Sequence, residues 1–255
     1  MTTDCREFPK LWCGVDVGNR RIHGNAIARI VSLGPRALRL CNTEGLSLSG
    51  MAVNSIHAKW VSSNSNLRFL DMSLCEGLTA EDITNILNGC QNITELNVSS
   101  MRLGKAGSRA VCLGVNNNLV KLDLSGNSLD MEWDSVGDEE IHSLTTRCPY
   151  MVELRLADSV SLTEKCLPFL CSLQSLTVLD LSRCYGFHPM GYLEMSFLRV
   201  LSVFGCVTED GLRVVREKLT NTRVNELEDA MSHVARATPP PHFTAIWGHK
   251  TKAHY

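Results

Sequence analysis

The residues in this 255-residue sequence that could support the most chemistry are its eleven cysteines, which can form disulfides or bind metal ions. An odd number of cysteines spread over this length is not the pattern of a secreted disulfide framework. No Cys-x-x-Cys pair occurs, and Cys166 and Cys171 lack a second Cys or His pair at zinc-site spacing. The eight histidines are scattered, without two at the helical spacing of metal ligands. We therefore expect reduced thiols, no structural metal and no cofactor.

Patterns typical of catalytic sites are also missing from the sequence. It contains neither a phosphate-binding Gly-rich loop nor His-Glu-x-x-His. The stretch Gly45-Leu46-Ser47-Leu48-Ser49 narrowly misses a nucleophile elbow. Paired acids such as Asp138 and Glu139 fit a solvated loop better than general acid–base work, which needs a cleft that perturbs a pKa. We expect no enzyme, and a hydrolase using Ser47 would be abandoned if Ser47→Ala left every activity unchanged.

Composition and charge restrict the class of partner. Apolar residues make up 44% of the chain, enough for a sizeable core, and the net charge is −2 without a long Lys/Arg run. This balance predicts no electrostatic surface for nucleic acid or membrane. No apolar run approaches the ~20 residues that span a bilayer, and the first ten residues lack the apolar core of a signal peptide. We expect an intracellular, soluble protein whose partners are proteins.

The elements that position these residues follow from an internal repeat. A Leu-x-Leu-type core recurs six times, with a further apolar residue three positions before each core. The cores are Leu70/Met72, Leu96/Val98, Leu122/Leu124, Leu154/Leu156, Leu179/Leu181 and Leu201/Val203. The pattern predicts an α/β leucine-rich-repeat solenoid, with short strands on its concave face and helices on its convex face.

A further repeat position accounts for several cysteines. The residues three places after the cores are small, polar or sulfur-containing: Cys75, Met101, Asn127, Ser159, Cys184 and Cys206. Such groups can bond turn backbone inside the solenoid. Cys90 and Cys148 lie three residues before Ile93 and Met151, a second recurrent placement. We interpret these five cysteines as packing residues whose buried thiols stay protonated and unreactive.

Capped helices are predicted between the cores. Residues 79–87 and 208–215 each open with Thr followed by acids, and Thr163 begins a third helix. The stretch 188–191 contains Pro189 and cannot comfortably begin a long helix, so the convex side should be thinner there.

Residues between the paired core positions point into the concavity. This row is polar and mostly acidic: Asp71, Asn97, Asp123, Arg155, Asp180 and Ser202. Six acids also fall between 130 and 140, with no Lys or Arg from Ser125 to Thr146. We interpret this stretch as an acidic insertion loop, either merely solvated or, through Trp133, a contact surface.

The repeat divides the chain into three predicted parts. Residues 1–63 form an N-terminal cap with degenerate repeats, 64–221 carry the leucine-rich repeats, and 222–255 form a C-terminal tail. The tail carries three consecutive prolines from Pro239, followed by Phe243, Ile246 and Trp247. An exposed apolar cluster of this kind would be an association hazard, which favours docking on the solenoid over waiting for a partner.

Several stretches resemble the S-phase kinase-associated F-box protein family of leucine-rich-repeat proteins. They are 147–154, 157–160, 181–185, 203–205 with 209–211, 234–236 and 246–250. The matches run from about Asn64 to Lys250, and residues 11–16 with 24–29 look like the segment that follows the family's F-box. No F-box precedes Leu11 in this sequence, so we expect the chain as given not to enter a ligase by the usual route.

The resemblance implies the substrate receptor of an SCF-type cullin-RING ubiquitin ligase in the nucleus and cytoplasm. In the family, the solenoid and its tail hold a Cks-type adaptor and a phosphorylated cyclin-dependent-kinase inhibitor, and the cullin linker requires an F-box upstream. Asp158, Arg183 and Tyr185 match contact positions, and Met231 falls where the family has an aromatic tail anchor.

The expected partner-binding set has seven members. It comprises the four residues suggested by the resemblance, the concave Asp123 and Asp180, and the tail residue Trp247. The alternative is a stand-alone interaction scaffold or decoy that binds a regulator without ubiquitin transfer.

Overall fold

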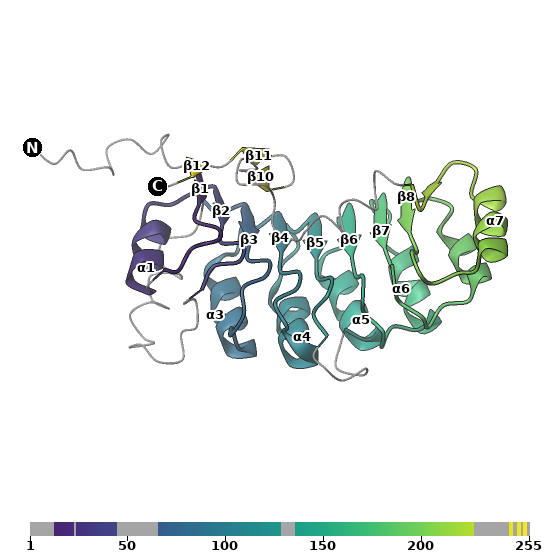
Figure 1. Ribbon diagram of the computed structural model, residues 1–255, viewed down its shortest axis with the longest axis horizontal. Helices are drawn as coiled ribbons and strands as arrows, with labels where there is room; N and C mark the ends of the chain where they lie inside the picture. Colours follow the sequence, from purple (N-terminus) through teal and green to yellow (C-terminus); the bar gives the residue numbers. More distant parts are fainter. Residues whose placement is uncertain are drawn as a thin grey trace, which may run out of the picture.

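The protein has two layers, one of short strands and one of helices (Figure 1). The computed structural model describes residues 13–22, 24–44, 66–128 and 136–226, and the backbone of three two-residue strands between 245 and 253. The strands lie side by side along one face, and the row is bowed so that its two ends rise above its middle (Figure 1).

The strand layer is a ten-stranded parallel sheet in the order β12-β1-β2-β3-β4-β5-β6-β7-β8-β9. Its members are β1 (Gly14–Asp16), β2 (Ala37–Arg39), β3 (Phe69–Asp71), β4 (Glu95–Asn97), β5 (Lys121–Asp123), β6 (Glu153–Arg155), β7 (Val178–Asp180), β8 (Val200–Ser202), β9 (Arg223–Val224) and β12 (Lys252–Ala253). From β1 to β9 each strand pairs with the next in the chain. This arrangement confirms the predicted α/β leucine-rich-repeat solenoid.

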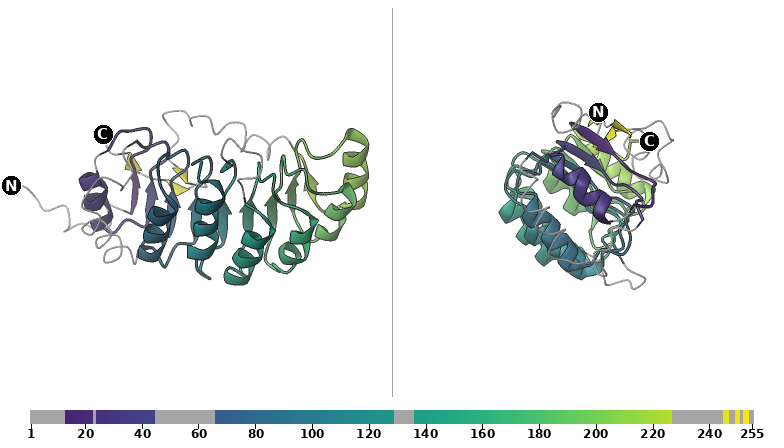
Figure 2. Two further views of the ribbon diagram at one scale, coloured as in Figure 1. Left: turned by 90° about the horizontal axis from the view of Figure 1, so that it is seen from below. Right: turned by 90° about the vertical axis from the view of Figure 1, so that its left-hand side faces the viewer.

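The helices form the second layer, which the end-on view of Figure 2 shows separated from the strands. They are α1 (Gly24–Ser32), α3 (Ala80–Gly89), α4 (Gly104–Gly114), α5 (Asp138–Arg147), α6 (Leu167–Cys171) and α7 (Glu209–Lys218), with the 3-10 helices η3 (Glu164–Cys166) and η4 (Pro189–Met195). The predicted caps are confirmed, because Thr79 forms a capping box with Asp82 and Thr208 accepts a hydrogen bond from the N–H of Gly211. The stretch at Pro189 forms a seven-residue 3-10 helix, in agreement with the prediction that no long helix begins there.

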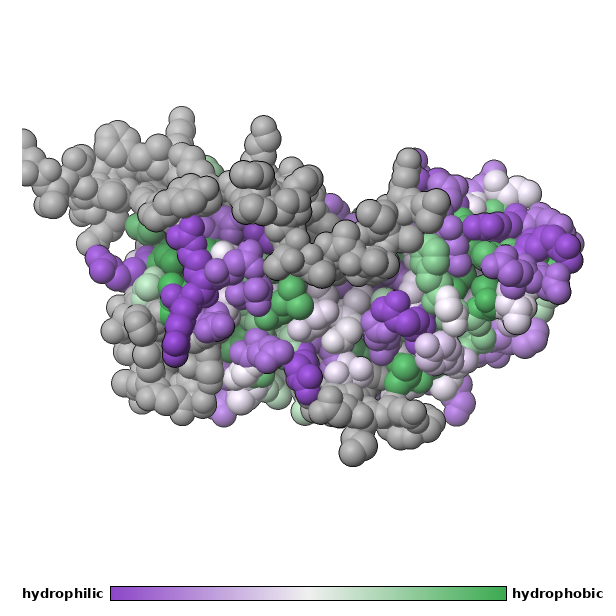
Figure 3. Space-filling model, in the orientation of Figure 1, coloured by the Kyte–Doolittle hydropathy of each residue, from purple (hydrophilic) through white to green (hydrophobic). Residues whose placement is uncertain are grey.

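The main core is an apolar cluster that runs from Val15 to Val224, and Ala37 and Phe69 form a small separate pair. The middle residues of β1 to β8 and Val224 of the two-residue β9 enter the main core, in register with their neighbours: Val15, Leu38, Leu70, Leu96, Leu122, Leu154, Leu179, Leu201 and Val224. Stacking therefore buries apolar faces that a single repeat would expose. Hydrophilic side chains dominate the surface over α7 in Figure 3, as expected of a terminal repeat with a polar outer face.

Two features differ from the pattern inferred from the sequence. The strand ladder extends beyond the six recognised cores, because β1 and β2 join it and Leu38 pairs in register with Leu70. The second feature concerns the predicted acidic loop. Asp138, Glu139 and Glu140 form the first turn of α5, where carboxylates interact favourably with the helix dipole. Residues 129–135, including Trp133, lie outside the described part of the chain.

The chain returns from one end of the sheet to the other. β12 pairs in parallel with β1, with Val15 opposite Lys252 and Asp16 opposite Ala253. The two-stranded antiparallel sheet of β10 (Ala245–Ile246) and β11 (His249–Lys250) lies beside β3. The edge of β1 that faces away from β2 is therefore occupied by a strand from the C-terminal part of the chain.

Candidate functional site

A row of left-handed residues follows the carboxyl ends of strands β1 to β8. Each lies three positions after its strand, and φ ranges from +53° to +73°: Asn19, Asn42, Leu74, Ser100, Gly126, Asp158, Arg183 and Gly205. We call these eight residues the rim row. In each of the first seven, the N–H donates to a carbonyl of the next repeat, as from Asp158 to Ser182 at 2.9 Å. A second backbone ladder therefore brings equivalent side chains of successive repeats next to one another.

Asp158 and Arg183 are neighbours in the rim row, although 25 residues separate them in the chain. The Nε and Nη2 atoms of Arg183 donate to the two carboxylate oxygens of Asp158, with 2.6 Å between Nη2 and Oδ2. The side chains are 44% and 33% exposed. Hydrogen bonding to Asp158 is the largest cause that raises the pKa of Arg183. The site therefore presents a charged guanidinium, oriented before any partner arrives and still open to solvent.

Tyr185 stands beside this pair with 63% of its surface exposed. Between it and Arg183, Cys184 points into the core, where its thiol donates to the carbonyl of Leu156 at 3.2 Å. Burial raises the pKa of the Cys184 thiol well above its ordinary value, so the group stays neutral. Anchoring Cys184 inside leaves its two neighbours on the surface. The structure thus brings together three of the predicted contact residues, Asp158, Arg183 and Tyr185.

Asp123 and Asp180 occupy a different environment from the rim pair. Each ends its strand, and its Oδ1 accepts a hydrogen bond from the backbone N–H two residues later, at 3.1 Å from Ser125 and 2.9 Å from Ser182. Both residues are buried, with 0% and 1% exposure. We assign these carboxylates a role in forming the turns that lead into the rim row. Their direct contact with a partner stays a prediction.

The concave side also carries cations that the sequence reasoning did not single out. Arg39 lies between two acids of neighbouring strands, with Nη1 at 3.0 Å from Asp16 Oδ2 and Nε at 3.5 Å from Asp71 Oδ2. Lys121 Nζ similarly lies 3.4 Å from Glu95 Oε1. The concave row that looked mostly acidic is thus partly neutralised by its own basic residues. Sequence reasoning missed Arg39 because its place beside Asp71 depends on the register of β2 against β3, which the local sequence does not carry.

At four of the six recurrent positions after the cores, namely Cys75, Asn127, Cys184 and Cys206, the side chain forms hydrogen bonds inside the solenoid, as predicted. The thiol of Cys75 donates to Leu40 O at 3.0 Å, and that of Cys206 to Leu181 O at 3.1 Å. The Asn127 amide donates to Val98 O at 2.7 Å. Burial raises the pKa of Cys75 to about 12 and that of Cys148 to about 12, so neither thiol forms a nucleophilic thiolate near neutral pH.

Met231 and Trp247 lie outside the residues whose placement is described. Within the described residues, no group of three or more His, Cys, Asp or Glu is arranged to hold a metal ion. None of the described helices has the length and apolar character needed to cross a membrane.

Comparison with known proteins agrees with the solenoid fold. The family model described as the SKP2 LRR domain matches residues 14–254. The leucine-rich-repeat-containing protein LegL7 from Legionella pneumophila superposes with a TM-score of 0.50 at 16% identity, over 80% of this chain and 69% of that chain. Identity this low shows the fold alone.

Two further solved structures have lower TM-scores. A chain of the yeast Rad7–Elc1 complex gives 0.43 at 15% identity, over 82% of this chain and 66% of that chain. A chain of the Drosophila Toll–Spatzle complex gives 0.46 at 13% identity, over 80% of this chain and 26% of that chain. This chain therefore spans just under two thirds of the yeast chain and about a quarter of the Drosophila one.

Proposed function

The chain belongs to the SKP2 leucine-rich-repeat domain family, and from this premise we propose that it recognises substrates for an SCF-type cullin-RING ubiquitin ligase. Its solenoid is a protein-interaction scaffold. The proposed partners are a Cks-type adaptor and a phosphorylated cyclin-dependent-kinase inhibitor. The single observation that carries the proposal is the Asp158–Arg183 pair beside the exposed Tyr185.

The chemistry of this site suits a protein surface. The Asp158 interaction uses Nε and one N–H of Nη2, so the remaining N–H groups of Arg183 can donate to an incoming carboxylate or phosphate. Asp158 can in turn accept a hydrogen bond from the partner. Arg and Tyr are enriched among the residues that carry most of the energy of protein interfaces. The site therefore offers a donor, an acceptor and an aromatic anchor on one edge of the solenoid.

The proposed role is non-catalytic. In this proposal the chain positions a regulator for ubiquitin transfer by other subunits, in the nucleus and cytoplasm. The cullin linker would be reached only through an F-box upstream of the solenoid. The support is the family relationship together with the exposed, oriented groups of the rim row, which are arranged for recognition and not for bond cleavage.

A pull-down from cell extract tests the proposal. Wild-type protein is compared with Arg183→Ala and with the control Arg213→Ala, which removes an exposed arginine of α7 that pairs with Asp210 three residues earlier. We expect recovery of the adaptor or the inhibitor with wild type and the control, and its loss with Arg183→Ala. Recovery of neither from wild type would overturn the proposed partnership.

A second measurement separates the ligase role from simple binding. Ubiquitin transfer to the captured inhibitor is followed in a reconstituted ligase in which this solenoid replaces the substrate receptor's own. Transfer that depends on Arg183 supports substrate delivery. Capture of the inhibitor without transfer would support a scaffold or decoy instead.

A further inference from the structure

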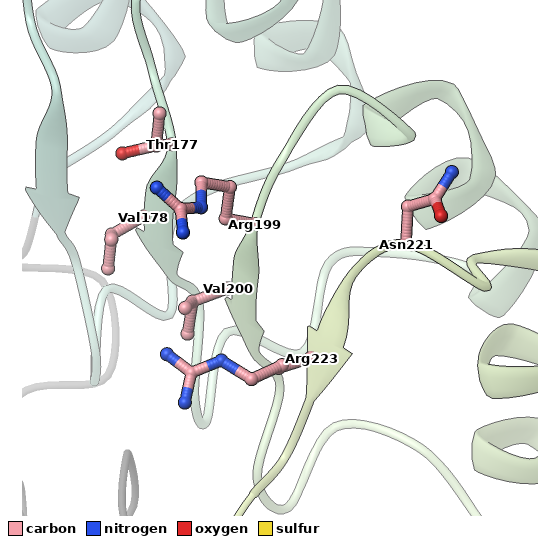
Figure 4. Close-up of a pocket in the computed structure, with 6 residues that line it drawn as sticks. All are labelled: Thr177, Val178, Arg199, Val200, Asn221 and Arg223. Carbon is pink, nitrogen blue, oxygen red and sulfur yellow. The ribbon is translucent and has the colours of Figure 1, made fainter.

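A hollow of about 490 Å³ lies at the amino-terminal ends of β7, β8 and β9, and none of the assignments above uses it. Its lining comprises Thr177, Val178, Arg199, Val200, Asn221 and Arg223 (Figure 4). We call it the strand-start pocket. Since the strands are parallel, this pocket and the rim row lie at opposite edges of the same sheet.

The pocket has an apolar base whose backbone is already hydrogen-bonded. Val178 and Val200 are the first residues of their strands, and Val200 is 5% exposed. The N–H of Val178 donates to Val152 O, and that of Val200 donates to Thr177 O. The N–H of Arg223 donates to Arg199 O at 2.9 Å. Because these backbone donors are occupied, the strong polar groups available to a ligand are side chains.

Two arginines supply those polar groups. Arg199 and Arg223 are both exposed and lie on successive repeats, and Figure 4 shows their guanidinium groups directed toward Val178 and Val200. Arg223 is already engaged, with Nη1 at 3.6 Å from Glu226 Oε2 among its interactions. An incoming oxyanion would compete with this exposed pair, which contributes little. The lining itself contains two cations and no acid. The pocket therefore combines positive charge with an apolar base.

We propose that the strand-start pocket binds an oxyanion on a side chain of an extended acidic peptide. The two guanidinium groups would bind a phosphate or carboxylate through charge-assisted, bidentate hydrogen bonds. The valines would pack against the carbon atoms of that side chain, a contact that a free inorganic anion cannot make. The inference rests on the proposed function, because the peptide belongs to a protein partner of the solenoid.

The position of the pocket suits a partner that crosses the sheet. Arg183 follows Val178 by five residues, which span at most about 17 Å in an extended chain. A peptide segment of about five residues could therefore contact both the pocket and the Asp158–Arg183 pair. The pocket would add a second anionic contact to recognition at the rim row.

The test uses three six-residue peptides that differ only at a central phosphoserine, glutamate or serine. Each is titrated into the full chain, and NMR follows the Nε–Hε signals of Arg199 and Arg223. We expect saturable shifts with the phosphoserine and glutamate peptides and no shift with the serine peptide. Tighter binding of the phosphoserine peptide would identify a phosphorylated side chain as the natural source of the oxyanion. Tighter binding of the glutamate peptide would identify an acidic side chain.

Matched variants tie the binding to the pocket. Arg199→Gln is expected to weaken peptide binding about tenfold, the effect of losing one charge-assisted contact. Arg199→Lys should restore part of this loss, because it retains the charge without the planar fork. Arg213→Gln, an equal change of charge on α7, should leave the affinity unchanged. Thermal unfolding of each variant verifies that it is folded.

Three results would overturn the inference. One is the absence of saturable shifts with both anionic peptides, and another is an equal response to the serine peptide. The third is displacement of the peptides by hexathymidylate at lower concentration, which would indicate a nucleic-acid site. The titration contains no adaptor, so its outcome is independent of the pull-down from extract. Peptide binding to the pocket can be absent while Arg183-dependent recovery persists, and peptide binding can persist when that recovery is absent.

Discussion

At the residue scale, the Asp158–Arg183 pair, for which we propose a role in recognition, contributes little to the stability of the fold. Its members are about one third and nearly one half exposed, and water screens exposed ion pairs strongly. Both residues also adopt positive φ, so the backbone ladder of the rim row fixes their positions independently of the ion pair. Orientation by a neighbour of opposite charge is useful mainly when a partner arrives.

A double-mutant cycle tests this interpretation. We expect Asp158→Ala, Arg183→Ala and the double variant to give a coupling energy below about 1 kcal/mol in urea unfolding. Removal of Arg183 should nevertheless abolish recovery of the partner. A coupling energy above about 2 kcal/mol would instead make the pair a determinant of folding.

Asn127 is the opposite case, a buried polar residue that stabilises the solenoid. Its Nδ2 donates to Val98 O at 2.7 Å and Leu124 O at 3.0 Å, and its Oδ1 accepts from the Met101 N–H at 2.9 Å. Asn127→Ala leaves these buried groups without that partner, and we expect a loss of about 3 kcal/mol in the free energy of unfolding.

The matched control for Asn127 is an exposed asparagine of the same solenoid. Asn118 donates through Nδ2 to Gln91 O at 3.2 Å near the surface, so Asn118→Ala should change the free energy of unfolding by less than about 1 kcal/mol. Equal urea midpoints for the two variants would contradict the role given to Asn127.

At the element scale, the segment after β7 is held by a close backbone contact. A Cβ atom at Gly186 would lie 2.0 Å from Leu162 O, and Gly186 forms a parallel bridge with Thr163. Because Gly186 has no side chain, the turn that follows Tyr185 can pack closely against the preceding repeat. This requirement concerns close approach and not a left-handed backbone.

Gly186→Ala is accordingly predicted to destabilise the protein by about 2 kcal/mol or more, because backbone atoms must move apart. Circular dichroism melts would measure the change. The control is Gly211→Ala in α7, where the new Cβ would have an ordinary 3.4 Å contact with Pro189 Cγ. There we expect no change, or a gain of up to about 1 kcal/mol from better helix propensity. Similar melts for both variants would refute the contact argument.

At the scale of the whole molecule, the buried thiols couple stability to alkaline pH. Burial raises the pKa of Cys75, Cys148 and Cys166 from an ordinary 9.0 to about 12. Between these values the unfolded chain loses thiol protons that the folded chain keeps. The stabilisation is therefore complete below about pH 9 and is lost as the pH rises toward 12.

We expect the free energy of unfolding to fall between pH 9 and 11 by about 1.4 kcal/mol per pH unit for each such thiol. Urea unfolding at a series of pH values measures the slope. Cys75→Asn, which places at this position the amide found at Asn127, should reduce the slope by the share of one thiol. A free energy of unfolding that stays constant up to pH 11 would show that these thiols are not protected in the fold.

Much of the solenoid could be predicted from the sequence because the signal is local. Leucines such as Leu70, Leu122 and Leu179 recur at the equivalent position of different repeats, and this pattern is visible in the sequence. The inward or outward direction of a side chain then follows from its position in a short strand. The caps at Thr79 and Thr208 depend on residues within one turn and were predicted for the same reason. The bonding role at Cys75 and Asn127 followed from their shared place in the repeat.

Contacts between repeats were decided only by the tertiary structure. Asp158 and Arg183 meet because stacking places equivalent residues of two repeats side by side, a consequence of register that neither local sequence carries. Stacking likewise placed Arg39 between Asp16 and Asp71, and it brought Arg199 and Arg223 to one pocket. The return of β12 to β1 joins segments more than two hundred residues apart. Periodicity in the chain determines which face of each element is buried, whereas the assembled solenoid determines which exposed groups become neighbours.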